Sequence, residues 1–86
     1  MADDVANRIK KVTADLLKVD RSKVTDNARF VQDLGAASIQ SIELVAAFEE
    51  EFGIEMDQDE ALSVQTVSDA ATYIRKVIAD QRGKTG

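Results

Sequence analysis

The sequence of 86 residues predicts one small all-α domain: a helical bundle of three main helices and one short helix, with a long ordered loop between the first two. Three segments repeat apolar residues at three- and four-residue steps, and no useful stretch alternates with the period of two that a strand would show. The length suffices for one domain with a modest core. We therefore assign residues 1–86 to a single domain and expect 82–86, which contain no apolar residue, to form a disordered tail.

The first helix is expected over residues 4–18. Its apolar stripe consists of Val5, Ile9, Val12 and Leu16, which follow each other at helical spacing, and Leu17 widens it. One face of this helix should therefore be buried.

The second helix is expected over residues 38–52, where apolar residues cover a wide arc and acidic residues a narrow stripe. This pattern predicts the most buried helix of the bundle, and Gly53 is a natural residue to end it. The preceding segment, 19–37, is long for a connection, and such loops are usually functional or disordered. We expect it to be ordered, because four apolar residues can anchor it: Val24, Phe30, Val31 and Leu34.

A short helix is expected over residues 58–62 and the last helix over 67–80. The last segment matches the helical template closely, and Thr66 with Asp69 resembles a capping box at its start.

Composition excludes several classes of function. The chain contains no cysteine and no histidine, so it lacks a thiol nucleophile, disulfides and the commonest general base. We therefore expect that it is not an enzyme. Its net charge of −5 argues against binding nucleic acid or an anionic membrane. No run of 18 apolar residues is present and the first residues are acidic, so we expect neither a membrane span nor a secretory signal. We expect a cytoplasmic monomer whose partners carry basic surfaces.

Ser38 is the first candidate for a functional residue. It lies where the N-cap of the second helix is expected, and a phosphate esterified to its hydroxyl would lie in the favourable field of the helix N-terminus. Serine is also a preferred N-cap, so position alone leaves an ordinary structural role open.

The residues around Ser38 distinguish a functional serine from an ordinary helix cap. Residues 30–45, which include Asp33-Leu34-Gly35-Ala36-Ala37-Ser38-Ile39, resemble the phosphopantetheine attachment region of acyl carrier proteins, whose pattern is roughly Asp-Leu-Gly-x-Asp-Ser-Leu followed by Val-Glu-Leu. Residues 24–30, 47–55 and 66–74 resemble further segments of that family in the same order. The resemblance covers nearly the whole chain, so it is far more specific than a match to one serine motif.

The resemblance implies that Ser38 carries 4′-phosphopantetheine, transferred from coenzyme A by a separate phosphopantetheinyl transferase. Acyl groups would be held as thioesters on the arm and shuttled between enzymes of fatty acid or related lipid biosynthesis. It also implies that the second helix docks on basic patches of these enzymes, through Glu43, Glu50, Glu51 and Ile39, with Asp33 and Glu49 as weaker candidates. A solvated helix face is the alternative for these acids.

The resemblance further implies a pocket for the acyl chain. Its expected lining is Ile42, Val45, Ala46, Phe48, Val64, Ala70 and Ile74, although such residues are most often simply core. No metal site is expected, because the acidic cluster Glu55, Asp57, Asp59 and Glu60 lacks the glycine and the glutamate spacing of an EF-hand loop.

Three positions depart from the family pattern. Ala37 replaces the aspartate before the serine, Gln40 occupies a position that is often acidic, and Ile39 replaces leucine. The helix start has thus lost two negative charges. The departures leave two explanations: a specialised carrier with a dedicated transferase or partner set, and an unmodified adaptor that kept the fold. A carrier of peptidyl, D-alanyl or polyketide intermediates is a separate alternative, because such carriers share the bundle and the modified serine and differ in their partners.

Overall fold

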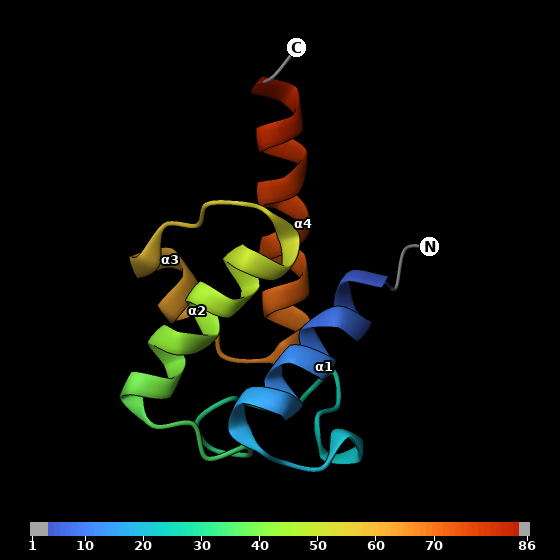
Figure 1. Cartoon of the computed structure of the whole chain (residues 1–86), viewed down its shortest axis with the longest axis vertical. Coiled ribbons are helices and arrows are strands. Elements are labelled where there is room, and N and C mark those ends of the chain that lie inside the picture. Colours follow the sequence, from blue (N-terminus) through green and yellow to red (C-terminus); the bar gives the residue numbers. More distant parts are fainter. Residues whose placement is uncertain (1–3, 85–86) are drawn as a thin grey trace.

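A computed structural model describes residues 4–84, with the side chains described as far as residue 81. Four α-helices and one short 3-10 helix follow each other: α1 (Asp4–Leu17), η1 (Arg21–Lys23), α2 (Ser38–Phe52), α3 (Gln58–Ser63) and α4 (Val67–Lys84). The helices α1, α2 and α4 form the bundle, and α3 lies beside α2 (Figure 1). The predicted all-α bundle with three main helices and one short helix is confirmed.

The helix ends follow from local chemistry. At the end of α1, Lys18 takes a left-handed conformation with φ 57°, so this helix stops one residue before the predicted end. At the end of α2, Gly53 has φ 63°, a value that glycine tolerates because it has no Cβ, and its N–H donates to the carbonyl of Glu49. The carboxylate of Asp57 caps α3, and the hydroxyl of Thr66 accepts from the N–H of Asp69 at the start of α4.

The predicted end of α4 is wrong. The helix continues four residues beyond Asp80 to Lys84, so the backbone of residues 82–84 is helical where the sequence predicted a disordered tail. Residues 85 and 86 lie outside the described part. One contact near this end is a hydrogen bond of 2.7 Å from the side-chain amide of Gln81 to the carbonyl of Glu55, and the last turns of α4 extend beyond the bundle (Figure 1).

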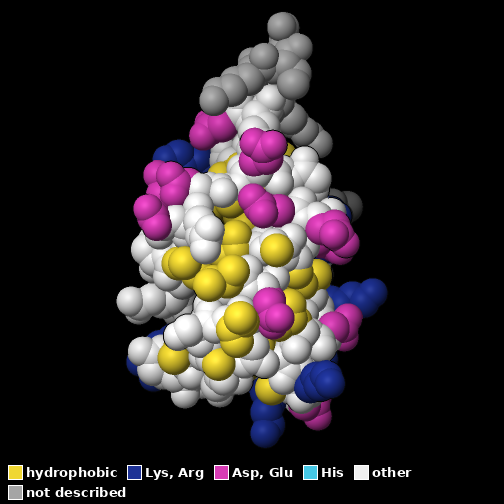
Figure 2. All heavy atoms as spheres, turned by 60° about the vertical axis from the view of Figure 1, so that its left-hand side comes forward, with side chains coloured by type: hydrophobic (Ala, Val, Ile, Leu, Met, Phe, Trp, Pro, Cys, Tyr) yellow, Lys and Arg dark blue, Asp and Glu magenta, His cyan; other side chains and the backbone are white. Residues whose placement is uncertain are grey.

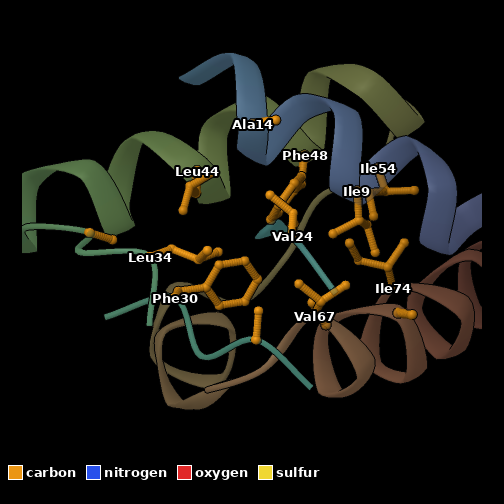
Figure 3. Packing of buried hydrophobic residues seen from close by; sticks show 14 residues of the cluster. Ile9, Ala14, Val24, Phe30, Leu34, Leu44, Phe48, Ile54, Val67 and Ile74 are labelled. Carbon is orange, nitrogen blue, oxygen red and sulfur yellow. The ribbon is translucent and has the colours of Figure 1, made fainter. Parts of the chain in front are cut away.

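The core lies where α1, α4 and the long loop meet α2. Its most buried side chains are Ile9, Thr13, Val24, Val67 and Ile74, and Figure 3 shows the apolar members pointing toward a shared interior. The expectation that α2 is the most buried helix is wrong, since its buried residues are Leu44 and Phe48, whereas α4 buries four apolar residues. The apolar arc of α2 is wider than its neighbours cover, and part of it faces solvent.

The loop between α1 and α2 is ordered, as predicted. Val24, Phe30 and Leu34 are buried anchors, whereas Val31 is 56% exposed and was wrongly expected to be one. The loop pairs with the segment before α4: the N–H of Phe30 donates to the carbonyl of Gln65, and the N–H of Val67 donates to that of Ala28. An ion pair of 2.7 Å between Lys10 and Asp26 joins the loop to α1. These bonds hold the segment that leads into Ser38.

No helix among residues 4–84 is both long enough and apolar enough to cross a lipid bilayer.

Candidate functional site around Ser38

Ser38 is the first residue of α2, and its side chain is exposed. The N-cap of this helix is Ala37, with extended φ −76° and ψ 165°, so the expectation that Ser38 is the N-cap is wrong by one position. Within the described part of the chain, the Ser38 hydroxyl has no hydrogen-bond partner. A serine that does not cap its own helix is free to carry a substituent.

The start of α2 lacks a side-chain cap, because alanine at position 37 offers no acceptor to the first N–H groups of the helix. Gln40 supplies half of a capping box: its Oε1 accepts from the N–H of Ala37 at 2.9 Å. No acidic residue lies in the first turn. Gln40, which occupies a position that is often acidic in the family pattern, therefore has a structural role, because its side chain links the backbone on the two sides of Ser38.

The turn before Ser38 is closed by its own hydrogen bonds. The N–H groups of Asp33 and Leu34 donate to the carbonyl of Arg29, and Gly35 passes through φ 73° on the way to Ala36. The Asp33 carboxylate accepts from the backbone N–H of Arg29 at 2.8 Å and from its guanidinium at 3.3 Å. These two bonds, the backbone one first, hold the pKa of Asp33 below its ordinary value. Asp33 therefore has a structural role as an ionised carboxylate.

A cavity of about 290 Å³ opens between the loop, α2, α3 and α4. Five of the seven residues expected to form the acyl pocket line it: Val45, Phe48, Val64, Ala70 and Ile74. The other two, Ile42 and Ala46, are exposed and are absent from its lining. They lie on the solvent side of α2, which the apolar pattern of that helix did not separate from the inner side.

The sequence missed several residues that complete this cavity. The missed apolar and aromatic members are Phe30, Val31, Leu44, Met56, Ala61, Leu62 and Tyr73, and the polar members are Gln32, Ser41 and Gln65. The ring of Phe30 meets that of Phe48 at 6.5 Å between centroids. Half of the missed residues come from the loop before α2 and from α3, and no local sequence pattern predicts where these two segments lie relative to α2.

Ser41 connects the cavity to the candidate serine. It lines the cavity and follows Ser38 by three residues, which places it about one helical turn further along α2. A group attached to Ser38 would therefore begin one turn away from a mostly apolar space. On the α4 side of that space, burial raises the pKa of the Tyr73 hydroxyl, so this group stays neutral.

The four acidic residues of α2 differ in how they are engaged. Glu43 and Glu50 are exposed and form no ion pair with any described residue. Glu51 pairs with Arg8 of α1 at 2.8 Å, and the Glu49 carboxylate accepts from the N–H of Met56 at 2.8 Å. Of the acids predicted to dock partners, Glu43 and Glu50 thus present free charge, whereas Glu51 joins α1 to α2.

Apolar side chains are exposed on the same side of the molecule. The large ones are Val31, Ile39, Ile42 and Leu62, and Ile39 is the most exposed at 66%. Figure 2 shows apolar side chains gathered over the side formed by α2 and α3, with acidic side chains among and around them. Exposed apolar side chains and unpaired carboxylates therefore share this face of the molecule.

The acidic segment before and within α3 is organised by helix capping. The Asp57 carboxylate accepts from the N–H groups of Asp59 and Glu60, at 2.9 and 3.3 Å. Among the residues the structure describes, no three potential ligands gather into a group that could hold a metal ion.

A family model described as phosphopantetheine attachment site matches residues 7–74, which is most of the chain. The matched range contains Ser38, the loop before it, the lining of the cavity and the first half of α4. The exposed and unbonded hydroxyl of Ser38, the uncapped helix start and the nearby cavity fit the prosthetic group of this family. The chain therefore belongs to the phosphopantetheine attachment family, as its resemblance to acyl carrier proteins predicted, and this domain is one that carries 4′-phosphopantetheine covalently on a serine.

Proposed function

We propose that Ser38 is the attachment serine, and that the chain carries acyl groups as thioesters between cytoplasmic enzymes of fatty acid or related lipid biosynthesis. The observation that carries this proposal is the placement of an exposed, unbonded serine hydroxyl one helical turn from a mostly apolar cavity. When bound, the arm supplies a terminal thiol, which the cysteine-free chain lacks. The protein itself is not a catalyst on this proposal, and all bond-making steps belong to partner enzymes.

The start of α2 supports attachment of a phosphodiester at Ser38. The first N–H groups of the helix lack a side-chain acceptor, and the dipole is positive there. The first turn holds no carboxylate that would repel the phosphate. An anionic substituent at Ser38 would therefore be stabilised by the helix that presents it.

The cavity supports an acyl cargo. An acyl chain that entered it would leave water for contacts with Phe48, Leu44 and Ile74, a gain of about 0.8 kcal/mol for each buried CH₂ group. The same burial would protect the thioester from hydrolysis. Val45 is one of the five predicted residues that line the cavity, and it lies one turn after Ser41. We therefore expect it to contact the part of the acyl chain that is nearest to the arm.

Partner docking is proposed for the surface that contains Ile39, Glu43 and Glu50. Exposed charge that makes no internal ion pair is available to a basic partner surface, where it would speed encounter and permit rapid release. Glu51 contributes less, because Arg8 already neutralises it.

A second candidate is an adaptor that keeps the fold without the arm, and the observation that favours it is Ala37. In the family pattern an aspartate precedes the serine and contributes to recognition by the transferase, and this chain has a methyl group there. A peptidyl or polyketide-type carrier would share the modified serine and would differ in its partners.

Intact-mass measurement after co-expression with phosphopantetheinyl transferases tests the proposal. We expect a gain of one phosphopantetheinyl group in the wild type and no gain in Ser38→Ala. Ser41→Ala is the matched control, because Ser41 is the next serine along the same helix and should leave loading intact. If no transferase, including one from the source organism, modifies the wild type, the carrier function is wrong and the adaptor is favoured.

A further inference from the structure

Charge is strongly segregated along this chain. Residues 30–74 contain ten acidic residues and no lysine or arginine, whereas seven of the eleven basic residues lie within residues 8–29. The two regions form different elements: the first contributes α2 and α3, and the second contributes η1 and most of α1. These elements pack against each other, since α1 contacts α2 and Arg8 pairs with Glu51 at 2.8 Å. In Figure 2, Lys and Arg side chains lie toward the edges of the view of the α2 and α3 side. Basic and acidic side chains are therefore concentrated on different elements of the fold, although the net charge is −5.

The basic region contains a shallow concavity, which we call the basic groove. Its lining is Asn7, Arg8, Lys11, Ala14, Asp15 and Arg21. Arg8 and Lys11 lie one turn apart on α1, and η1 brings Arg21 beside them. Arg8 already pairs with Asp4 and Glu51.

Two cations of the basic groove remain available. Lys11 and Arg21 are exposed, and neither forms an ion pair with a described residue. Among the described residues, Asp15 is the one carboxylate that lines the groove. The groove therefore presents positive charge that no described carboxylate neutralises.

We propose that the basic groove binds the acidic surface of α2 on a second copy of this chain, so that the protein associates head to tail. Glu43 and Glu50, the two free carboxylates of α2, define this acidic surface. It complements the groove in charge, and both surfaces belong to the same molecule. This association does not require Ser38 to be modified, so it stands apart from the proposed carrier function.

The geometry determines the kind of assembly. The groove and the acidic surface are different patches, so each copy can engage one neighbour with its groove and another with its α2 helix. Such contacts build closed rings or open chains, according to whether the rotation between neighbouring copies closes. The net charge of −5 opposes approach at long range, and exposed ion pairs are weak, so the association should appear at high protein concentration and low salt. The dilute protein remains the monomer that the sequence predicts.

The assembly would have a consequence for partner binding. A neighbouring groove that covers Glu43 and Glu50 hides the surface proposed for docking, so association and docking would compete.

Charge-reversal variants test the proposal in a Ser38→Ala background, which removes any effect of the arm. The first variant reverses the groove with Lys11→Glu and Arg21→Glu. The second reverses the acidic surface with Glu43→Lys and Glu50→Lys. All four side chains are exposed, so the substitutions remove no buried contact, and circular dichroism checks that the helices remain.

Sedimentation velocity is measured from about 0.05 to about 1 mM protein in about 20 mM salt, a range suited to weak complexes with Kd near the millimolar level. We expect the weight-average sedimentation coefficient of the parent to rise with concentration, and the rise to vanish in about 300 mM salt. Each reversed variant alone should stay monomeric, because its groove and its α2 surface then carry the same sign. An equimolar mixture of the two should associate again, since each surface meets an opposite one.

A control with Lys76→Glu, an exposed lysine of α4 outside the groove, should associate like the parent. The proposal is overturned if the parent stays monomeric across the range. It is also overturned if either reversed variant associates as the parent does, or if the mixture fails to recover association.

Discussion

Because the start of α2 lacks a side-chain cap, we expect a capping residue at position 37 to raise the free energy of unfolding. The backbone of this residue already has the extended conformation of an N-cap, and Gln40 already accepts from its N–H. An aspartate or asparagine at position 37 would add the missing acceptor for the N–H of Ile39 or Gln40 and complete the capping box. We expect Ala37→Asn to raise the free energy of unfolding by about 1 kcal/mol, the usual value of an N-cap side chain.

Ala37→Asp should gain more than Ala37→Asn, because a carboxylate also interacts with the helix dipole. The excess is about 0.3–1 kcal/mol at low salt and should shrink as salt is added. For a domain of this size, a gain of about 1 kcal/mol raises Tm by about 4–8 °C. Urea and thermal denaturation of the unmodified wild type, Ala37→Asn and Ala37→Asp measure the two effects separately. If Ala37→Asn leaves the urea midpoint unchanged, the helix start does not lack an acceptor and our account of Ser38 as an uncapped first residue fails.

The same variants test why this chain departs from the family pattern. If the missing carboxylate limits recognition, Ala37→Asp should speed loading by a general-purpose transferase by about two- to five-fold, the equivalent of about 0.4–1 kcal/mol for one exposed ion pair. Ala37→Asn should leave the rate near that of the wild type, since it adds the cap without the charge. An equal rate in all three proteins would show that position 37 does not limit loading.

Three further predictions follow from single contacts. Thr13 is fully buried, and its hydroxyl has no hydrogen-bond partner within residues 4–84. Thr13→Val should therefore raise the free energy of unfolding by about 1 kcal/mol in urea denaturation. A lower free energy of unfolding in this variant would show that the hydroxyl is hydrogen-bonded. Gln40→Ala should lower the free energy of unfolding by about 0.5–1 kcal/mol in urea denaturation, because the bond to the N–H of Ala37 is lost, whereas Gln40→Glu keeps the acceptor and should retain stability. The pKa of Asp33 is lowered by its bonds from Arg29, so its stabilising effect is complete above the ordinary value of 3.8 and is lost as pH falls below that value. Asp33→Asn should therefore be less stable at neutral pH and lose less stability between about pH 4 and pH 2.5; parallel acid limbs in the two proteins would contradict this assignment.

Local patterns predicted most of the secondary structure. The spacing of apolar residues and the capping residues predicted the observed bounds of α2 and the start of α4. They predicted the bounds of α1 and α3 to within one residue. The end of α4 was missed, because the absence of apolar residues after Asp80 says nothing about a helix that extends beyond the bundle. The left-handed conformation of Lys18, the residue that follows α1, was missed, since lysine gives no local signal for positive φ.

The candidate site was also predicted only in part from the sequence. The motif around Ser38, together with the collinear match along the chain, sufficed to predict the family and the serine that we propose is modified. Which side chains surround the cavity was decided by the tertiary structure: the apolar pattern of α2 identified Val45 and Phe48 but equally included Ile42 and Ala46, which face solvent.

The physical reason is that periodicity reports which side chains of a helix avoid water, and not which neighbour covers them. Whether a charge is free depends likewise on contacts between distant segments. Glu43 and Glu51 are alike in the sequence, yet Arg8 reaches Glu51 from α1, at 43 residues' separation, and leaves Glu43 exposed. The sequence by itself determined the helices, the charge balance and the attachment motif. The packing of α1, α3 and the loop against α2 decided which residues line the cavity and which carboxylates are free.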